Sequence, residues 1–247
     1  MTTPVNLELE TPNIAPLTNV FECTKALERV LNRAGHLPGL CCFYGPSGYG
    51  KTKGVAYTAN QYRTYVIEVK SVWTRKVFLS KILFEMGLQP PKDLGSMLDM
   101  ICQHLTLSGR ALIIDEADHL ANKGTTFIEL VRDIYEGSNA PIMLVGEEGL
   151  PNKLKRWERF YGRFLDWTAA KPPTLSDAQR LCQMYCRKVK IADDLVEAIH
   201  RDCKSTRLVA VNLDLVQSTA LNLGLKSMDL AAWGDHEFYR GDAPLRK

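Results

Sequence analysis

The sequence predicts an α/β fold built on a five-stranded parallel sheet, and two observations support this prediction. Short apolar runs of strand length alternate with longer segments that have the spacing of amphipathic helices. A glycine-rich loop at residues 45–52 joins the first apolar run to a helix, as in a parallel βα unit. The predicted strands are Leu40–Tyr44, Tyr65–Val69, Ala111–Glu116, Pro141–Val145 and Phe164–Trp167.

Composition places the chain among ordinary globular proteins. It has 247 residues, of which 45% are hydrophobic and 24% are charged, so it can bury a sizeable core. The net charge of +3 is too small to indicate nucleic-acid binding, so any basic surface must be local. Seven cysteines without a Cys-x-x-Cys pair indicate reduced thiols rather than a zinc site or a disulfide framework. Without a signal-like start or a run long enough to cross a bilayer, we expect a cytoplasmic protein.

Prolines divide the chain into four predicted parts. Residues 1–17 are expected to form a flexible arm, and residues 18–170 an α/β nucleotide-binding domain whose first helix runs from Asn19 towards Gly35. That helix either borders the nucleotide base or only packs against the sheet edge. After Pro172 and Pro173, residues 171–225 are predicted to form a small all-helical lid, followed by a tail at residues 226–247.

The glycine-rich loop has the pattern of a phosphate-binding loop. Its glycines allow backbone N–H groups to close around phosphate oxygens, Lys51 can reach the β and γ phosphates, and the Thr52 hydroxyl is a ligand for Mg²⁺. A chance match is disfavoured because a predicted strand precedes the loop and a predicted helix follows it. The residues expected to bind ATP are Gly45, Pro46, Ser47, Gly48, Tyr49, Gly50, Lys51 and Thr52.

Two adjacent carboxylates end the third predicted strand. Asp115 is expected to hold Mg²⁺, and Glu116 is expected to orient and deprotonate the attacking water. Kinases of small molecules do not need this glutamate, so the pair predicts an ATP-hydrolysing enzyme. His119 follows closely, but it has no partner at metal-ligand spacing and is interpreted as a packing or surface residue.

A basic cluster follows the second predicted strand, at the sheet edge where open α/β sheets expose binding loops. Cations beside an aromatic side chain and a hydroxyl group suit contacts with the DNA backbone. The alternative is a solvated helix start with a packed tryptophan. The candidate DNA-binding residues are Lys70, Trp73, Thr74, Arg75 and Lys76.

Further charged residues could act on the γ-phosphate. Related ATPases carry a polar residue that senses that phosphate after the fourth strand, and Glu147 is the acidic candidate at this position here. Arg207 at a lid helix start could point back at the nucleotide. Arg159 and Arg163 lie in the basic segment Leu150–Arg163, and either could stabilise transition-state charge on the ATP of a neighbouring subunit. The alternative for this segment is a basic, solvated helix.

These motifs together resemble the AAA+ ATPases: the loop Gly45–Thr52, the strand Leu112–Glu116, the arginines before Phe164, and Arg207 within a helical lid. Within that superfamily, the compact lid and the segments Ile113–Asp118 and Leu144–Leu150 resemble the MuB, TniB and TnsC branch of transposition regulators. The resemblance covers residues 19–223.

The resemblance implies an ATP- and Mg²⁺-dependent protein that oligomerises as a ring or helical filament on duplex DNA. Such a protein marks target sites and recruits or stimulates a transposase, with Lys70, Trp73, Thr74 and Arg75 near the DNA. MuB also carries an N-terminal DNA-binding appendage, and the arm here is too short for one, so DNA contact is expected to fall to the ATPase core. The ExeA-like secretion ATPases are the alternative, but they need a membrane or cell-wall extension that this sequence does not show.

Overall fold

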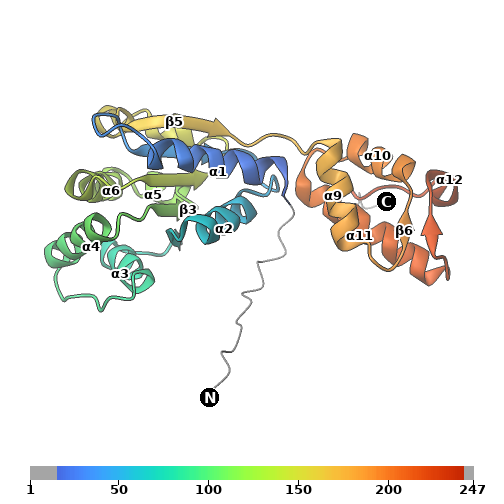
Figure 1. The fold of residues 1–247 in the computed structure, drawn as a ribbon, viewed down its shortest axis with the longest axis horizontal. Coiled ribbons are helices and arrows are strands. Elements are labelled where there is room, and N and C mark those ends of the chain that lie inside the picture. Colours follow the sequence, from blue (N-terminus) through green and yellow to red (C-terminus); the bar gives the residue numbers. More distant parts are fainter. Residues whose placement is uncertain (1–15, 242–247) are drawn as a thin grey trace, which may run out of the picture.

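The main domain contains the five-stranded parallel sheet that the sequence predicts (Figure 1). The structure gives its strand order as β2-β3-β4-β1-β5. The structure is a computed structural model, and it describes residues 16–241. Of the predicted flexible arm at residues 1–17, residues 1–15 lie outside the described residues, as do residues 242–247 of the predicted tail. Leu17 is buried, so the predicted flexible arm is too long at this residue. The strands are β1 Leu40–Tyr44, β2 Tyr65–Glu68, β3 Leu112–Asp115, β4 Ile142–Gly146 and β5 Phe164–Ala169.

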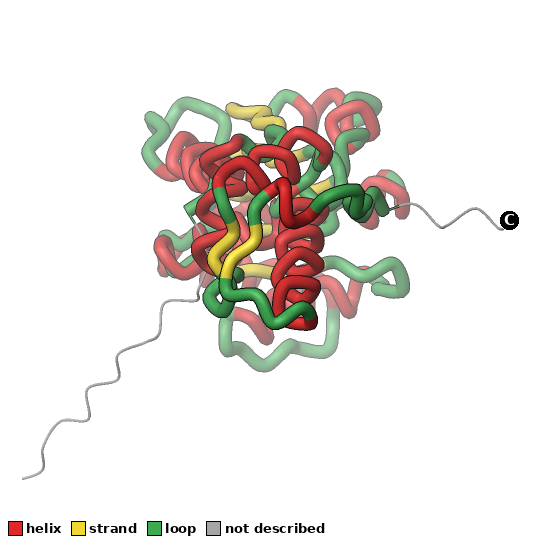
Figure 2. The backbone as a smooth tube through the Cα atoms, turned by 90° about the vertical axis from the view of Figure 1, so that its right-hand side faces the viewer, coloured by secondary structure: helices red, strands yellow, loops and turns green. Residues whose placement is uncertain are grey.

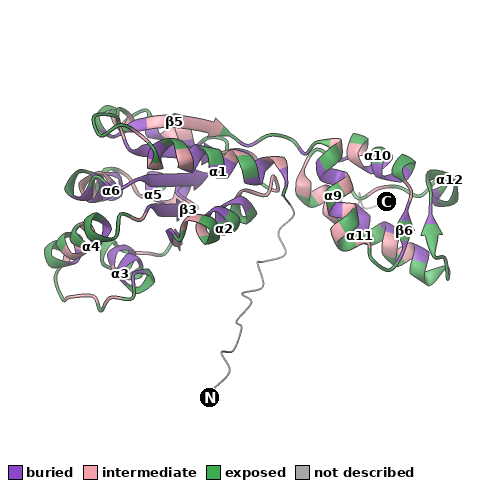
Figure 3. Cartoon of the chain, in the orientation of Figure 1, coloured by how far each residue is buried: buried purple, intermediate pink, exposed green. Residues whose placement is uncertain are grey.

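Helices cover both faces of this sheet. Alternate strand residues turn to opposite faces, so successive residues such as Cys41 and Cys42 belong to separate hydrophobic cores. Figure 3 shows the buried residues concentrated on the sheet and on the helix faces that meet it. One face carries α1 Thr18–Leu31 and α2 Lys51–Tyr62. The other carries α3 Arg75–Glu85, α4 Leu94–Ser108, α5 Asp118–Lys123 and α6 Thr125–Ser138.

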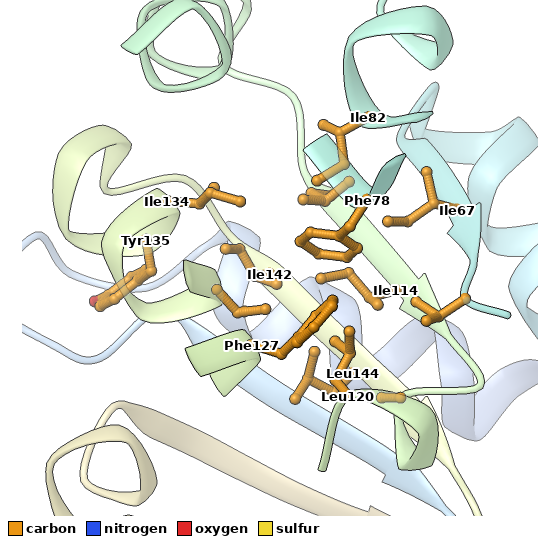
Figure 4. Packing of buried hydrophobic residues seen from close by; sticks show 14 of the residues in the cluster. Ile67, Phe78, Ile82, Ile114, Leu120, Phe127, Ile134, Tyr135, Ile142 and Leu144 are labelled. Atoms are coloured by element: carbon orange, nitrogen blue, oxygen red, sulfur yellow. The ribbon is translucent and has the colours of Figure 1, made fainter. Parts of the chain in front are cut away.

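The larger core lies between β2, β3, β4 and helices α3 to α6. Phe78 of α3 and Phe127 of α6 meet edge to face there, with ring centroids 6.1 Å apart (Figure 4). Ile114 and Leu144 project from the sheet beneath these rings. This packing holds the sheet rigid, and with it the loops that follow the carboxyl ends of the strands.

The basic segment Leu150–Arg163 forms two short helices instead of one solvated helix. They are α7 Leu150–Leu154 and α8 Glu158–Tyr161, and the intervening residues break the helical hydrogen bonding. Leu150, Leu154 and Phe160 are buried in the larger core. The segment is therefore anchored to the domain, and its cations lie on the surface.

The lid has its own hydrophobic core, but the prediction that it is all helical is wrong. Two short parallel strands, β6 Lys190–Ile191 and β7 Ser227–Met228, pair between its helices (Figure 2). Trp233 in the predicted tail is buried in this core, so residues 226–241 are part of the lid. The helices are α9 Leu175–Tyr185, α10 Asp193–Asp202, α11 Thr206–Asn222 and α12 Leu230–Trp233.

One buried side chain holds the last described segment against the lid. The Asn212 amide donates to the Tyr239 carbonyl oxygen at 2.9 Å, and its carbonyl oxygen accepts from the Tyr239 N–H at 2.7 Å. Asn212 has no exposed surface, so these bonds face no competition from water. A side chain in the third lid helix therefore positions a segment that follows it by 27 residues.

Replacing Asn212 with alanine should lower the free energy of unfolding by about 1–3 kcal/mol, because the backbone groups of Tyr239 lose their partner. Amide hydrogen exchange should accelerate first in the segment around Tyr239. The exposed Asn222 at the end of α11 provides the control, because Asn222→Ala should change neither quantity appreciably. Equal effects of the two substitutions would contradict the role of Asn212.

No helix described between residues 16 and 241 combines the length and the apolar character needed to cross a membrane.

Candidate nucleotide-binding site

The glycine-rich loop lies where β1 ends and α2 begins, and its backbone needs glycine. Gly48 has a φ of +82°, in the left-handed region that other residues avoid. A Cβ atom at this position would also lie 3.3 Å from the Arg207 side chain. The loop therefore brings its backbone close to the lid, and α2 begins at Lys51 directly after it.

Lys51 folds back over this loop. Its Nζ donates to the carbonyl oxygens of Gly45 at 2.7 Å and Pro46 at 3.0 Å. Burial lowers the pKa of Lys51, and the nearby carboxylates of Glu116 and Asp115 oppose this shift. An anion in the loop would give the ammonium group a charged acceptor, which forms a stronger hydrogen bond than a carbonyl.

Thr52, Asp115 and Glu116 come together beside the lysine. The Thr52 hydroxyl donates to Asp115 Oδ2 at 3.1 Å, and the Glu116 N–H donates to Asp115 Oδ1 at 2.8 Å. Glu116 has a φ of +55°, a conformation that is unusual for a residue other than glycine and that often marks functional sites.

The electrostatics of these groups fit a bound Mg²⁺ ion. Burial raises the pKa of Asp115, and burial together with the charge of Asp115 raises the pKa of Glu116. Both shifts mean that negative charge is destabilised here without a cation. A hydroxyl and carboxylates are the hard oxygen ligands that Mg²⁺ prefers, so the residues fit the ion.

The lid completes the site from the other side. Arg207 donates its backbone N–H to the Gly48 carbonyl oxygen at 3.0 Å and its guanidinium to Ser47 Oγ at 2.6 Å. Between loop and lid lies a cavity of about 420 Å³ whose lining includes the charged side chains of Lys51 and Glu116. Its lining also includes the apolar or aromatic side chains of Leu17, Leu181, Tyr185 and Ala210. A lining that combines charged with apolar residues suits a ligand that carries both phosphates and a flat base.

Glu147, the candidate sensor, lies beside the site, but its side chain points into solvent. The Glu147 carboxylate is 67% exposed and lies 3.9 Å from Lys153 Nζ. Its backbone N–H donates to Asp118 Oδ2 at 2.6 Å, and Lys153 donates to Asp118 Oδ1 at 2.7 Å. A Cβ atom on Gly146 would lie 2.3 Å from Asp118 Oδ2, so this approach requires glycine.

Sequence reasoning missed two of the residues that organise the site. Buried Asp118 connects the loop after β4 to Lys153 of α7. Its position just after Asp115 and Glu116 is the sequence signal that could have identified it as a site residue. The Asn19 amide donates to the carbonyl oxygens of Tyr49 and Lys171, both at 2.8 Å, and so connects α1, the loop and the segment after β5. Nothing in the local sequence around Asn19 indicates these distant partners.

The basic cluster follows the carboxyl end of β2, and the phosphate loop likewise follows the carboxyl end of β1, so both lie at the same end of the sheet. Lys70 lies two residues after the last residue of β2, Glu68, and pairs with it, and Trp73 packs on the larger core. Thr74 caps α3 by accepting from the Val77 N–H at 3.3 Å. Arg75 and Lys76 in the first turn of this helix are exposed and, among the described residues, have no ion pair.

Arg163 lies at the amino ends of the strands, opposite to the carboxyl ends that carry the phosphate loop. Its carbonyl oxygen accepts from the N–H of Leu40 at the start of β1, whereas the phosphate loop follows the end of β1. The strand between them spans roughly 15 Å. Arg163 pairs with Glu136 at 2.9 Å, and the exposed Arg159 lies in α8 just before it. Arg163 is therefore placed away from the nucleotide site of its own chain.

A phosphate loop after β1, a carboxylate pair at the end of β3, and a lid that contacts the loop define an ATPase fold of the AAA+ class.

Comparison with known proteins agrees with this class and refines it. An AAA domain matches residues 33–154. The DNA transposition protein B of the Mu-like prophage FluMu of Haemophilus influenzae is 26% identical over 158 residues, covering 59% of this chain and 53% of that protein. The chain therefore carries an AAA domain and is similar to a MuB-like transposition protein. It spans about half the length of this curated relative.

Solved structures share the fold at low sequence identity. Domain III of the replication initiation protein DnaA of Thermotoga maritima superposes with a TM-score of 0.59 and 18% identity, covering 93% of this chain and 95% of that one. The ORC1 protein of Aeropyrum pernix in complex with DNA gives a TM-score of 0.57 and 17% identity, covering 88% and 63%.

Proposed function

We propose that this chain hydrolyses ATP in a Mg²⁺-dependent manner and binds duplex DNA as a homo-oligomer, a ring or a helical filament. We further propose that it regulates DNA transposition by marking target sites and recruiting or activating a transposase. The contact of Thr52 with Asp115, beside Lys51 and Glu116, is the observation that carries the ATPase proposal. The similarity to transposition protein B supports the biological role.

Each residue of the site has a proposed task. Lys51 and the loop backbone bind the phosphates. Arg207 connects the phosphate loop to the lid, so its contacts couple the position of the lid to the bound nucleotide. Bound Mg²⁺, held by Thr52 and Asp115, would supply positive charge that offsets the charge of the phosphates. Glu116 takes the proton of the attacking water.

The position of Arg163 supports a catalytic role in a neighbouring subunit. A guanidinium that cannot reach its own nucleotide could approach the phosphates of the next copy in an assembly. Hydrolysis would then depend on oligomerisation. Arg159 is the second candidate for this task because it is exposed in the same surface segment.

DNA binding is proposed for the cluster after β2, where Lys70, Arg75 and Lys76 are exposed at the sheet edge that also carries the phosphate loop. A gel-shift titration with a non-hydrolysable ATP analogue, with ADP and without nucleotide tests the proposal. Binding should require the ATP analogue and should weaken steeply as salt rises, because cations that contact phosphates displace counterions. Binding that is absent, or indifferent to nucleotide, would contradict it.

Replacing Arg75 with alanine should weaken DNA binding several-fold and reduce the slope of log affinity against log salt by about 0.9, the value for one lost phosphate contact. ATP binding should not change, because Arg75 does not line the nucleotide cavity. The exposed lid residue Lys188 supplies the control: Lys188→Ala should retain the wild-type slope. If both variants retain the slope, the cluster does not contact the DNA backbone.

A further inference from the structure

Val72 is the most exposed of the large hydrophobic side chains in the described part of the chain, at 83%. It lies at the apex of a tight turn within the basic cluster. The Trp73 N–H donates to the Lys70 carbonyl oxygen at 3.1 Å, which closes a β-turn with Ser71 and Val72 at its centre. The turn thus presents one apolar side chain to solvent.

This turn is held firmly on both sides. Before it, the Val69 N–H donates to the Asp115 carbonyl oxygen at 3.0 Å, which extends the pairing of β2 with β3. After it, Trp73 packs against the larger core and Thr74 caps α3. Val72 is therefore presented on a preorganised support, and little conformational entropy is lost if it binds a partner.

The surroundings of Val72 indicate the chemistry of that partner. A single exposed valine is unremarkable by itself, because folded proteins expose much apolar surface. Here, however, Lys70, Arg75 and Lys76 lie within four residues of it. The cores of protein interfaces are depleted of charged residues, whereas apolar wedges flanked by cations are typical of proteins that enter the minor groove of DNA.

We propose that Val72 inserts into the minor groove of duplex DNA and loosens the stacking of a base step, while Lys70 and Arg75 contact the phosphates on the groove walls. The inference rests on the proposed DNA binding and specifies its mode. The minor groove is about 6 Å wide, which admits a single β-turn tip but not a helix. Valine has no hydrogen-bonding group, so this contact reads shape and deformability instead of base identity.

The test uses the full chain with a non-hydrolysable ATP analogue and duplexes that contain 2-aminopurine, whose fluorescence rises when it unstacks. Wild-type protein should increase the fluorescence. Val72→Ala should remove that increase. It should also weaken binding about fivefold to tenfold, because alanine lacks the two methyl groups of valine that would be buried against the bases. The salt dependence of Val72→Ala should match the wild type, since no charge is lost.

Two further variants separate insertion from electrostatics. Leu107, on α4, is 78% exposed, so Leu107→Ala controls for the loss of an exposed apolar side chain and should behave as wild type. Arg75→Ala should reduce the salt slope yet retain part of the fluorescence increase. If Arg75→Ala weakens binding but Val72→Ala matches the wild type in affinity and fluorescence, insertion is overturned and DNA binding stands. A wild-type protein that does not bind duplex DNA would overturn both.

Discussion

Replacing Glu116 with glutamine should slow ATP hydrolysis by about two to four orders of magnitude while ATP and DNA binding persist. The amide keeps the shape of the side chain but cannot accept the proton of the attacking water. Lys51, Thr52 and Asp115 remain in place, so the phosphate and Mg²⁺ contacts survive. Steady-state phosphate release and equilibrium binding of a fluorescent ATP analogue measure the two quantities separately.

Glu148 offers a matched control for this substitution. It is an exposed glutamate in the neighbouring loop after β4, and it does not line the nucleotide cavity. Glu148→Gln should therefore hydrolyse ATP at the wild-type rate. Rapid turnover by Glu116→Gln would remove Glu116 from its proposed role, whereas loss of ATP binding would show that its carboxylate supports the site structurally.

The parts of the site that the sequence predicts are those encoded by neighbouring residues. Lys51 and Thr52 follow the glycines of one loop, and Asp115 and Glu116 end one apolar strand, so short patterns suffice to locate them. The parallel sheet follows from the same logic, because its strands are apolar runs separated by helices. The structure then brings Thr52 and Asp115, 63 residues apart, into contact.

The remaining features depend on contacts between distant residues. Asn19 bonds to a carbonyl 152 residues away, and no periodicity encodes such a pair. The lid strands β6 and β7 have two residues each, too few to show the alternation that identifies a strand. The sequence places Trp233 in a tail because charged residues and glycines surround it, yet the lid core buries it. Tertiary packing decides each of these cases.

Replacing Arg163 with alanine should reduce DNA-stimulated ATP hydrolysis by about three orders of magnitude and leave ATP binding by the single subunit intact. The expected loss is large because a guanidinium stabilises charge that develops only in the transition state. Arg159→Ala, measured in parallel, identifies which of the two arginines acts, since both lie in the surface segment before β5. DNA-stimulated phosphate release and equilibrium ATP binding are the measurements.

The ion pair of Arg163 with Glu136 provides the control for a structural role. Glu136→Ala breaks the same pair but leaves the arginine, so it should retain hydrolysis if the guanidinium acts on a neighbour. Mixing Arg163→Ala subunits with Asp115→Ala subunits should then restore part of the activity, because one supplies an intact site and the other an intact arginine. Equal loss in Glu136→Ala and no recovery on mixing would mean that Arg163 supports the fold and that hydrolysis does not require this contact between subunits.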